Sequence, residues 1–283
     1  MKQKIAILAD SGSDLHDVKG DAPLYILPLR IIIDGIEYID RIDISLKEVL
    51  SKLDDATIKT SLPSPKDIID TLDLIKRDGY THVIAIPISQ GLSGTMNIIR
   101  NIASEYEGLE IALIDTKNIS IASGYSSLHA LELIEKGEDF DTIVKTINDS
   151  VNLKKVFFTV DKLSYLKKGG RIGLVAATVA DLLRIKPVIS CNEEGIYHTL
   201  KKQRGYKRAI NQLLEFASDF AKDHKLYDVT LLNCDSKEDL EAFEANIKEA
   251  LPNVRNFQIT TISPTLAIHT GPEALGIAVS IIK

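Results

Sequence analysis

The residues best suited to chemistry in this chain lie in the segment 88–95, ISQGLSGT. It combines the hydroxyl groups of Ser89, Ser93 and Thr95 with glycines that let a ligand approach the backbone. An apolar run at 81–87 precedes it and a helical pattern follows, so we expect the segment to join a strand to the start of a helix. Unpaired N–H groups and the helix dipole favour an anion at such a place.

The anion expected at this loop is a single carboxylate. No lysine or arginine lies between Asp78 and Arg100, whereas a polyphosphate usually recruits a cation. The plainer alternative is a strand-to-helix turn in which a serine only caps the helix.

Two other segments carry groups that could hold a carboxylate. In the loop 60–65, TSLPSP, two prolines fix the backbone and can pre-position the hydroxyls of Thr60 and Ser61, although the end of this loop also suits a helix start. Near the chain end, His269 precedes a Thr-Gly-Pro turn. Its imidazole can donate to a carboxylate in either protonation form, and a packed or solvated histidine is the alternative.

Basic residues form two further candidate groups. Arg171 follows the glycine pair in the stretch 163–172, LSYLKKGGRI, which also suits a helix C-terminus with a glycine cap. The stretch 201–208, KKQRGYKR, holds five positive charges in eight residues and suits either a docking patch or a solvated strand end and helix start. No phosphate loop, GxGxxG, nucleophile elbow or metal-ligand motif is present, so we expect no metal site.

The elements that must position these residues follow a strand–helix alternation in the first half. Short apolar strands separated by helices imply a parallel sheet covered on both faces, with ligands beyond the carboxyl ends of its strands. The polar loops 10–14, 89–95 and 115–120 should therefore meet at one end of the sheet. The strands are expected at 4–9, 81–87 and 109–114, and the helices at 66–77, 96–106, 120–136 and 141–151.

Turn and cap signals refine this interpretation. The extended runs 25–33 and 36–39 flank Asp34-Gly35 and predict a hairpin. Ser45 and Glu48 form a capping-box pattern for a helix over 46–53. From residue 152 onward the pattern changes to an α+β domain with a mixed sheet. Its strands are expected at 155–160, 187–190, 196–200, 228–233, 256–261 and 275–282, and its helices at 163–166, 174–183, 206–222 and 237–251.

The composition of the chain limits the classes of protein to which it can belong. The chain has 283 residues, 45% hydrophobic and 26% charged, which suits two globular domains, here 1–152 and 153–283, with a cleft between them. A net charge of −6 argues against nucleic-acid binding. Two cysteines make no disulfide framework, and neither a signal peptide nor a long apolar run is evident, so we expect a cytoplasmic protein.

Taken together, these segments resemble the DegV family, described as the fatty-acid-binding subunits of bacterial fatty acid kinase. The resemblance runs the length of the chain and implies the two-domain α/β fold of that family. The matching motifs are Asp10-Ser11-Gly12-Ser13-Asp14, Thr60-Ser61-Leu62-Pro63-Ser64, Leu92-Ser93-Gly94-Thr95, Asp115-Thr116, the stretch 163–172, Lys186-Pro187, Arg204, and His269-Thr270-Gly271-Pro272 with Gly276.

The resemblance implies a non-enzymatic carrier with no cofactor, which buries a long-chain fatty acid between its domains. Its carboxylate would be held by the hydroxyls of Thr60, Ser61 and Ser93 and the adjacent Gly94 and Thr95, with His269 nearby. A separate ATP-dependent kinase would convert the acid into an acyl phosphate, and exchange of the acid could involve transient membrane contact. Docking or phosphate contacts would fall to Arg171, Arg204, Lys207 and Arg208, and the small-residue helix 121–128 could form part of the tunnel wall.

Two other functions remain open from the sequence. A serine esterase or acyl transferase could use Ser93 with His269 and either Asp10 or Asp115, because such triads are defined in space and not by sequence order. A DNA-binding or regulatory module could use the stretch 201–208, although the negative net charge disfavours it.

Overall fold

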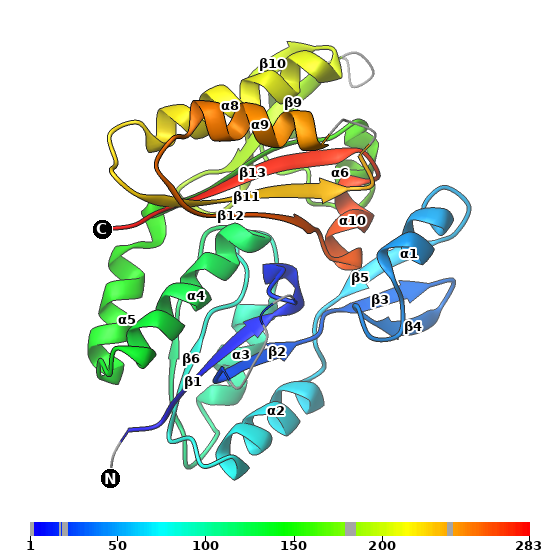
Figure 1. The fold of residues 1–283 in the computed structure, drawn as a ribbon. Helices are drawn as coiled ribbons and strands as arrows, with labels where there is room; N and C mark the ends of the chain where they lie inside the picture. Colours follow the sequence, from blue (N-terminus) through cyan, green and yellow to red (C-terminus); the bar gives the residue numbers. More distant parts are fainter. Residues whose placement is uncertain (1–2, 17, 19–21, 179–184, 237–239) are drawn as a thin grey trace.

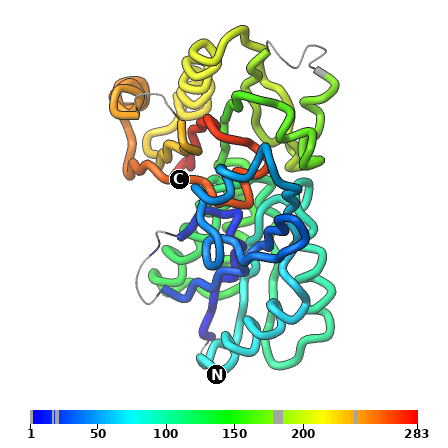
Figure 2. The backbone as a smooth tube through the Cα atoms, turned by 90° about the vertical axis from the view of Figure 1, so that its right-hand side faces the viewer, coloured from blue at the N-terminus to red at the C-terminus, as the bar shows by residue number. Residues whose placement is uncertain are grey.

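The computed structural model describes residues 3–16, 18, 22–178, 185–236 and 240–283. The two halves of the chain are stacked on one another, with the first half below and the second above in Figures 1 and 2. No helix in these described ranges is long and apolar enough to cross a bilayer.

A parallel sheet forms the centre of the first half, as predicted. Its strand order is β2-β1-β6-β7, with β1 at Ile5–Asp10, β2 at Leu24–Leu27, β6 at His82–Ala85 and β7 at Glu110–Leu113. Alternate side chains of β1 pack on opposite faces, Ile5 and Ile7 on one and Ala6 and Leu8 on the other. The first face is covered by α4 (Ile121–Glu135) and α5 (Phe140–Asp149), and the second by α2 (Pro65–Arg77) and α3 (Thr95–Ala103).

A small antiparallel sheet, β4-β3-β5, projects from this half and was not predicted. It contains β3 (Arg30–Ile33), β4 (Ile36–Ile39) and β5 (Ile58–Ser61), with α1 (Leu46–Lys52) packed nearby. The predicted hairpin is confirmed: Ile33 pairs with Ile36, and Asp34 and Gly35 take φ of 50° and 86°, as a tight primed turn requires.

Two predictions about these segments are wrong. The run 25–33 is not one strand, because Leu24–Leu27 pairs with β1 while Arg30–Ile33 belongs to the small sheet. Pro28 stands at the break and has no N–H for a sheet hydrogen bond. Thr60 and Ser61 are not in a loop, because they are the last two residues of β5. In the small sheet Thr60 pairs with Ile31 of β3, and Ser61 pairs with Arg30.

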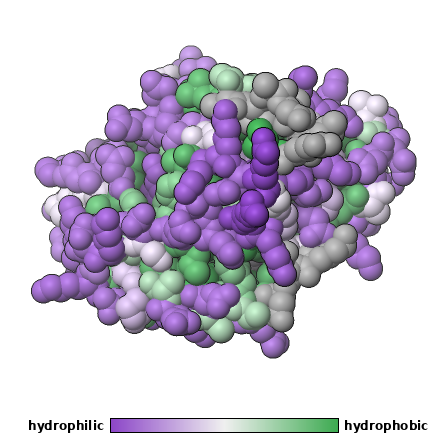
Figure 3. Space-filling model, turned by 90° about the horizontal axis from the view of Figure 1, so that it is seen from above, coloured by the Kyte–Doolittle hydropathy of each residue, from purple (hydrophilic) through white to green (hydrophobic). Residues whose placement is uncertain are grey.

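The second half is a mixed sheet, as predicted, in the order β10-β9-β8-β13-β11-β12. Helices α8 (Tyr206–Ala221) and α9 (Leu240–Ala250) cover the apolar outer face of this sheet. The molecular surface on this side, seen from above in Figure 3, is mainly hydrophilic. The strands are β8 (Lys154–Thr159), β9 (Ile185–Cys191), β10 (Tyr197–Arg204), β11 (Tyr227–Cys234), β12 (Val254–Thr261) and β13 (Ala274–Ile281). Short 3-10 turns, η1 (Ser11–Ser13) and η2 (Val151–Leu153), follow β1 and precede β8.

The described residues of the second half also contain three shorter helices. They are α6 (Leu163–Lys168), α7 (Val175–Thr178) and α10 (Pro264–Thr270). The predicted helix 174–183 begins as α7, and its remainder lies outside the described residues, as do the first three residues of the predicted helix 237–251. The sequence interpretation missed α10, which the Ser263 side chain caps and Gly271 ends at a φ of 74°.

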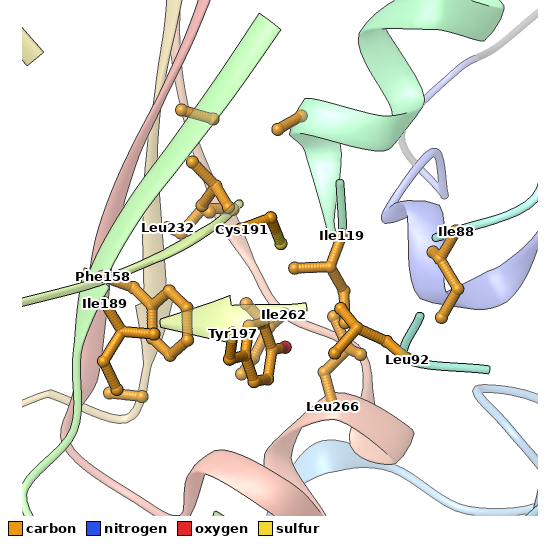
Figure 4. Packing of buried hydrophobic residues seen from close by; sticks show 14 of the residues in the cluster. Ile88, Leu92, Ile119, Phe158, Ile189, Cys191, Tyr197, Leu232, Ile262 and Leu266 are labelled. Atoms are coloured by element: carbon orange, nitrogen blue, oxygen red, sulfur yellow. The ribbon is translucent and has the colours of Figure 1, made fainter. Parts of the chain in front are cut away.

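The inner face of the mixed sheet packs on the first half in one shared core (Figure 4). Loop residues Ile88, Leu92 and Ile119 from the first half belong to the same core as Phe158 and Leu266 from the second, and Leu92 and Ile119 lie next to Leu266 in Figure 4. The capping boxes predicted from sequence at Ser45/Glu48, and found at Ser64/Asp67, fix the starts of α1 and α2 on either side of β5.

Candidate functional site

The three polar loops meet at the carboxyl end of the parallel sheet, as predicted. The Asp10 carboxylate accepts from the Ile88 N–H at 3.2 Å, and the Ser120 N–H donates to the Gly12 carbonyl at 2.9 Å. The Ser89 N–H donates to the carbonyl of Asn118 at 2.8 Å. These bonds join the loops to one another, so the sheet brings them together although up to about a hundred residues separate them in sequence.

Two buried carboxylates fasten α10 to this end of the sheet. Asp14 accepts from the Ser263 N–H at 2.8 Å and from Arg41 Nη2 at 3.1 Å. Asp40 accepts from the Thr265 N–H at 3.2 Å and from the Ser11 hydroxyl at 2.6 Å. Burial raises the pKa of Asp14 to about 7, although Arg41 favours its charged form. The aspartates therefore have a structural role, which is to position the helix that carries His269.

His269 and Thr60 form the central pair of the site. Thr60 Oγ1 and His269 Nε2 lie 2.9 Å apart, which links β5 of the small sheet to α10 of the second half. His269 is 9% exposed, and its Nδ1 has no hydrogen-bond partner among the described residues. Burial, helped by the charge of Arg171, lowers the pKa of His269 to about 4, so the imidazole is neutral near pH 7.

Gly169, the residue that ends α6, has no side chain, so the main chain can pack directly against the His269 imidazole. A Cβ at this position would lie 2.0 Å from His269 Nδ1. Of the glycine pair that the sequence suggested as a helix cap, Gly169 therefore also makes room for the histidine ring.

A polar cavity of about 190 Å³ lies around this pair. It brings together Thr60, Ser61, Ser93, Arg171 and His269, five of the residues singled out in the sequence. The full lining is Leu29, Thr60, Ser61, Leu62, Ile88, Leu92, Ser93, Ile119, Arg171, Tyr197, Thr265, Leu266 and His269. A carboxylate-binding role for these residues remains a prediction.

The other candidates lie elsewhere. Gly94 and Thr95 are not in the cavity lining, and Thr95 is fully buried behind Ser93. Arg204, Lys207 and Arg208 are solvent-exposed at the end of β10 and the start of α8, and none of them lines this cavity. Of the four basic candidates, the cavity therefore contains Arg171 alone.

The serine hydroxyls of the loop 88–95 have two different roles. Ser89 donates to the Gly195 carbonyl in the β9–β10 turn at 2.9 Å, so it fixes the loop on the second half and is not free for a ligand. Ser93 lines the cavity, and its Oγ lies 2.9 Å from Thr95 Oγ1 and accepts from the Thr95 N–H at 3.3 Å. Ser93 is therefore the hydroxyl of this loop that can reach a ligand.

An apolar cavity adjoins the polar one between the two halves. The two cavities share Ile119, Tyr197 and Leu266, which Figure 4 shows close together. The apolar cavity is lined by Ile119, Ser120, Val156, Phe158, Tyr197, Leu232, Ile262, Leu266, Thr270, Ala274, Leu275 and Gly276. Its free volume is about 40 Å³, so it is narrow. Helix α4 contributes Ile121, Ala122 and Tyr125 to the surrounding core, but it is not among the lining elements.

Sequence reasoning missed three features of the site. It placed no cation beside the serine loop, yet Arg171 lines the cavity and its Nη1 donates to the Gly169 carbonyl at 2.9 Å. It also missed Thr265 and Leu266, because no helix was expected there. The Ser-Pro pair at 263–264, a frequent helix start, was a signal that could have revealed them.

A hydrogen-bonded Ser–His–Asp triad is not assembled among the described residues. His269 Nε2 faces Thr60, and Nδ1 has no carboxylate partner. Asp10 accepts from the Ile88 N–H, and Asp115 from the Gln90 and Lys117 N–H groups. The described residues therefore do not form the triad that the esterase alternative assumes.

The fold and the site define a two-lobed α/β protein with a polar cavity next to an apolar one. The model of the "Uncharacterised protein, DegV family" matches residues 4–281. A DegV domain-containing protein of Clostridium acetobutylicum is 37% identical over 278 residues, covering 98% of this chain and 99% of that protein. The chain belongs to the DegV family.

Solved structures share the fold over its whole length. A fatty-acid-binding DegV family protein from Thermus thermophilus superposes with a TM-score of 0.91 at 28% identity, covering 99% of this chain and 100% of that one. The fatty acid kinase B3 protein of Streptococcus pneumoniae, solved loaded with linoleic acid, superposes with a TM-score of 0.84 at 21% identity, covering 99% and 100%. At the latter identity the likeness shows the fold alone.

Proposed function

We propose that this protein binds one long-chain fatty acid, with the carboxylate in the polar cavity and the acyl chain between the two halves. The observation that carries the proposal is that the two cavities adjoin at Ile119, Tyr197 and Leu266, which line both. An amphiphile with one small anionic head and an apolar tail matches that arrangement. The fatty acid ligand of the Thermus thermophilus relative supports the same class of ligand.

The carboxylate contacts follow from the protonation of His269. With its proton on Nε2, the neutral imidazole donates to Thr60 Oγ1, so the Thr60 hydroxyl keeps its own proton for the ligand. The Ser93 and Ser61 hydroxyls supply further donors, and Arg171 supplies a positive charge. Hydrogen bonds to a charged group are worth about 1.5–3 kcal/mol each, which suffices to orient the acid.

The acyl chain supplies most of the affinity. Each buried CH₂ contributes about 0.8 kcal/mol, so a 16-carbon tail offers on the order of 10 kcal/mol before the costs of binding. The apolar cavity is narrow, with a free volume of about 40 Å³. The tail would lie along its lining, between the inner face of the mixed sheet, α10 and the loops of the first half.

We further propose that the protein presents the carboxylate to a separate ATP-dependent kinase. A carboxylate oxygen would attack the γ-phosphorus of ATP while the bond from that phosphorus to ADP breaks, and ADP would leave with the bonding electrons. The exposed Arg204, Lys207 and Arg208 are suited to docking that partner. In this scheme the halves 1–152 and 153–283 act as two lobes around the acid, in the cytoplasm, with transient membrane contact during acid exchange.

The test is direct binding of palmitate by calorimetry to the wild type and to Thr60→Val. We expect the variant to lose about 1.5–3 kcal/mol of binding free energy, because the valine is similar in shape but cannot donate. Thr57→Val is the matched control, since Thr57 is exposed just before β5 and lines neither cavity. Equal affinity of both folded variants would remove Thr60 from the site, and no palmitate binding by the wild type would refute the function.

A further inference from the structure

A cavity of about 490 Å³ lies away from the acid site, between α8 and the start of β8. The loop after β7 and the β9–β10 turn complete its wall, the first through Lys117 and the second through Asn192 and Glu193. None of its lining residues lines the polar cavity or the apolar one. A ligand in this cavity therefore leaves the proposed fatty acid site free.

Three phenylalanines give this cavity an aromatic wall. Phe157 of β8 is buried, and its ring centroid lies 6.1 Å from that of Phe216 and 6.0 Å from that of Phe220. Phe216 and Phe220 are one turn apart on α8 and are only half-buried, so both rings can gain further contacts. A ring that enters the cavity can pack on them in the offset-stacked or edge-to-face arrangements that aromatic pairs prefer.

A lysine without a partner lies beside this aromatic wall. Lys155 and Phe157 are two residues apart on β8, so their side chains leave the sheet on the same face. Lys155 lines the cavity and is half-buried, and it makes no hydrogen bond or ion pair with any residue that the structure describes. Burial lowers the pKa of Lys155, and the more distant Cys191 and Glu193 act against this change. An anion placed next to this ammonium would favour its charged form.

Two other lysines add positive charge to the lining. Lys117 Nζ donates to the Glu193 carbonyl at 2.7 Å, and Lys154 Nζ donates to the Ser150 carbonyl at 3.1 Å and to its hydroxyl at 2.9 Å. Lys154 is 2% exposed, and burial lowers its pKa to about 8. The lining also contains two acids, Glu193 and Asp219, but both are exposed to solvent. The charge at the buried positions of the cavity is therefore positive.

We infer that this cavity is a second binding site, which takes a small aromatic carboxylate. The ring of the ligand packs on the half-buried rings of Phe216 and Phe220, and its carboxylate accepts from the Lys155 ammonium. Lys117 and Lys154 already donate to protein oxygens, which leaves one free ammonium and so favours a single carboxylate over a polyphosphate. The inference goes beyond the proposed function, because the two ligands occupy different cavities.

The test titrates the protein with phenylacetate and with cyclohexylacetate, and follows binding by NMR chemical shifts. The two probes share a carboxylate and a six-membered ring, and only the ring of phenylacetate is aromatic. We expect phenylacetate to bind roughly two- to tenfold more tightly, because a favourable pair of aromatic rings adds to the burial of apolar area. Equal affinities for the two probes, or no binding of phenylacetate, would overturn the inference.

The carboxylate contact is tested by Lys155→Gln, which removes the charge. The affinity for phenylacetate should fall roughly tenfold in this variant, and Lys155→Arg should keep most of the affinity because it keeps the charge. Lys202→Gln is the matched control, since Lys202 is an exposed lysine on β10 of the same sheet and is absent from the cavity lining. The same affinity in Lys155→Gln and Lys202→Gln would contradict the inferred site.

The aromatic contact is tested by Phe216→Leu, which keeps an apolar side chain. This variant should reduce the preference for phenylacetate over cyclohexylacetate. Phe257→Leu is the control, because Phe257 is a half-buried phenylalanine on β12 that does not line the cavity, and it should keep the preference. A preference that Phe216→Leu leaves unchanged would argue against the ring contact.

Thr60→Val shows which cavity holds the probe. Thr60 lines the polar cavity and not this one, so the variant should bind phenylacetate as tightly as the wild type does. Loss of phenylacetate binding in Thr60→Val but not in Lys155→Gln would place the probe in the proposed fatty acid site and overturn the inference. Neither outcome depends on palmitate, so failure here is distinct from failure of the proposed function.

Discussion

The contribution of the buried His269 to the stability of this protein should fall on mild acidification. Its pKa is lowered from 6.5 to about 4 in the folded protein, first by burial and then by the charge of Arg171. The unfolded chain therefore binds a proton between these two values while the folded protein does not. The contribution of His269 is fully present above pH 6.5 and is lost progressively as the pH falls toward 4.

The size of the effect follows from the two pKa values. Between pH 7.5 and pH 5, the linkage relation gives a loss of about 2 kcal/mol for a shift from 6.5 to about 4. Other buried groups change the free energy of unfolding in the opposite direction over this pH range. Asp10 and Asp14 have pKa values raised to about 7 by burial, so their contribution to stability is greatest at low pH and is lost as the pH rises through 7.

The assay separates these contributions by comparing variants. The free energy of unfolding is measured by urea titration at both pH values for the wild type and for His269→Gln, which cannot titrate. The difference between the two proteins should shift by about 2 kcal/mol between the pH values, because the aspartates contribute equally to both. His224→Gln, at a partly exposed histidine, is the control. A pH-independent difference between wild type and His269→Gln would refute the burial of a neutral imidazole.

Three further predictions follow from the site. Gly169→Ala should cost about 1–3 kcal/mol of stability and weaken palmitate binding, because its Cβ would lie 2.0 Å from His269 Nδ1. The control is Gly170→Ala, which has a φ of 71° and no atom within 4 Å of its Cβ, so it should lose stability through backbone strain alone. Ser93→Ala should reduce the free energy of palmitate binding, measured by calorimetry, by about 1.5–3 kcal/mol. The control Ser104→Ala removes an exposed hydroxyl at the end of α3, and equal palmitate affinities of the two variants would exclude Ser93 as a ligand contact. Leu266→Phe adds bulk where the polar and apolar cavities meet, so competition assays should show palmitate affinity falling more than that of butyrate; an equal change for both acids would place the tail elsewhere.

Local signals in the sequence were enough to predict the parallel sheet, the mixed sheet and the meeting of the polar loops. Apolar strands alternating with helices leave few other arrangements, and the Asp34-Gly35 turn specifies its own hairpin. The small sheet was not predicted because its strand β5 pairs with β3 across α1, a contact that no local pattern encodes.

The site could be predicted only in part, for a similar reason. Thr60, Ser93 and His269 carry groups whose chemistry is visible in sequence, and the structure places them around one cavity. The role of Ser89 was misread, because its partner is a backbone carbonyl 106 residues away. Arg171 was not expected beside the serine loop, since its proximity depends on how α6 packs against the first half.

The central claim is that the two adjoining cavities hold a fatty acid. The most direct test is native mass spectrometry of the protein purified from a bacterial host, followed by denaturing extraction and identification of any bound small molecule. The account predicts one bound long-chain fatty acid per protein, lost or reduced in Leu266→Phe. A ligand-free protein that also fails to take up added palmitate or oleate would contradict it.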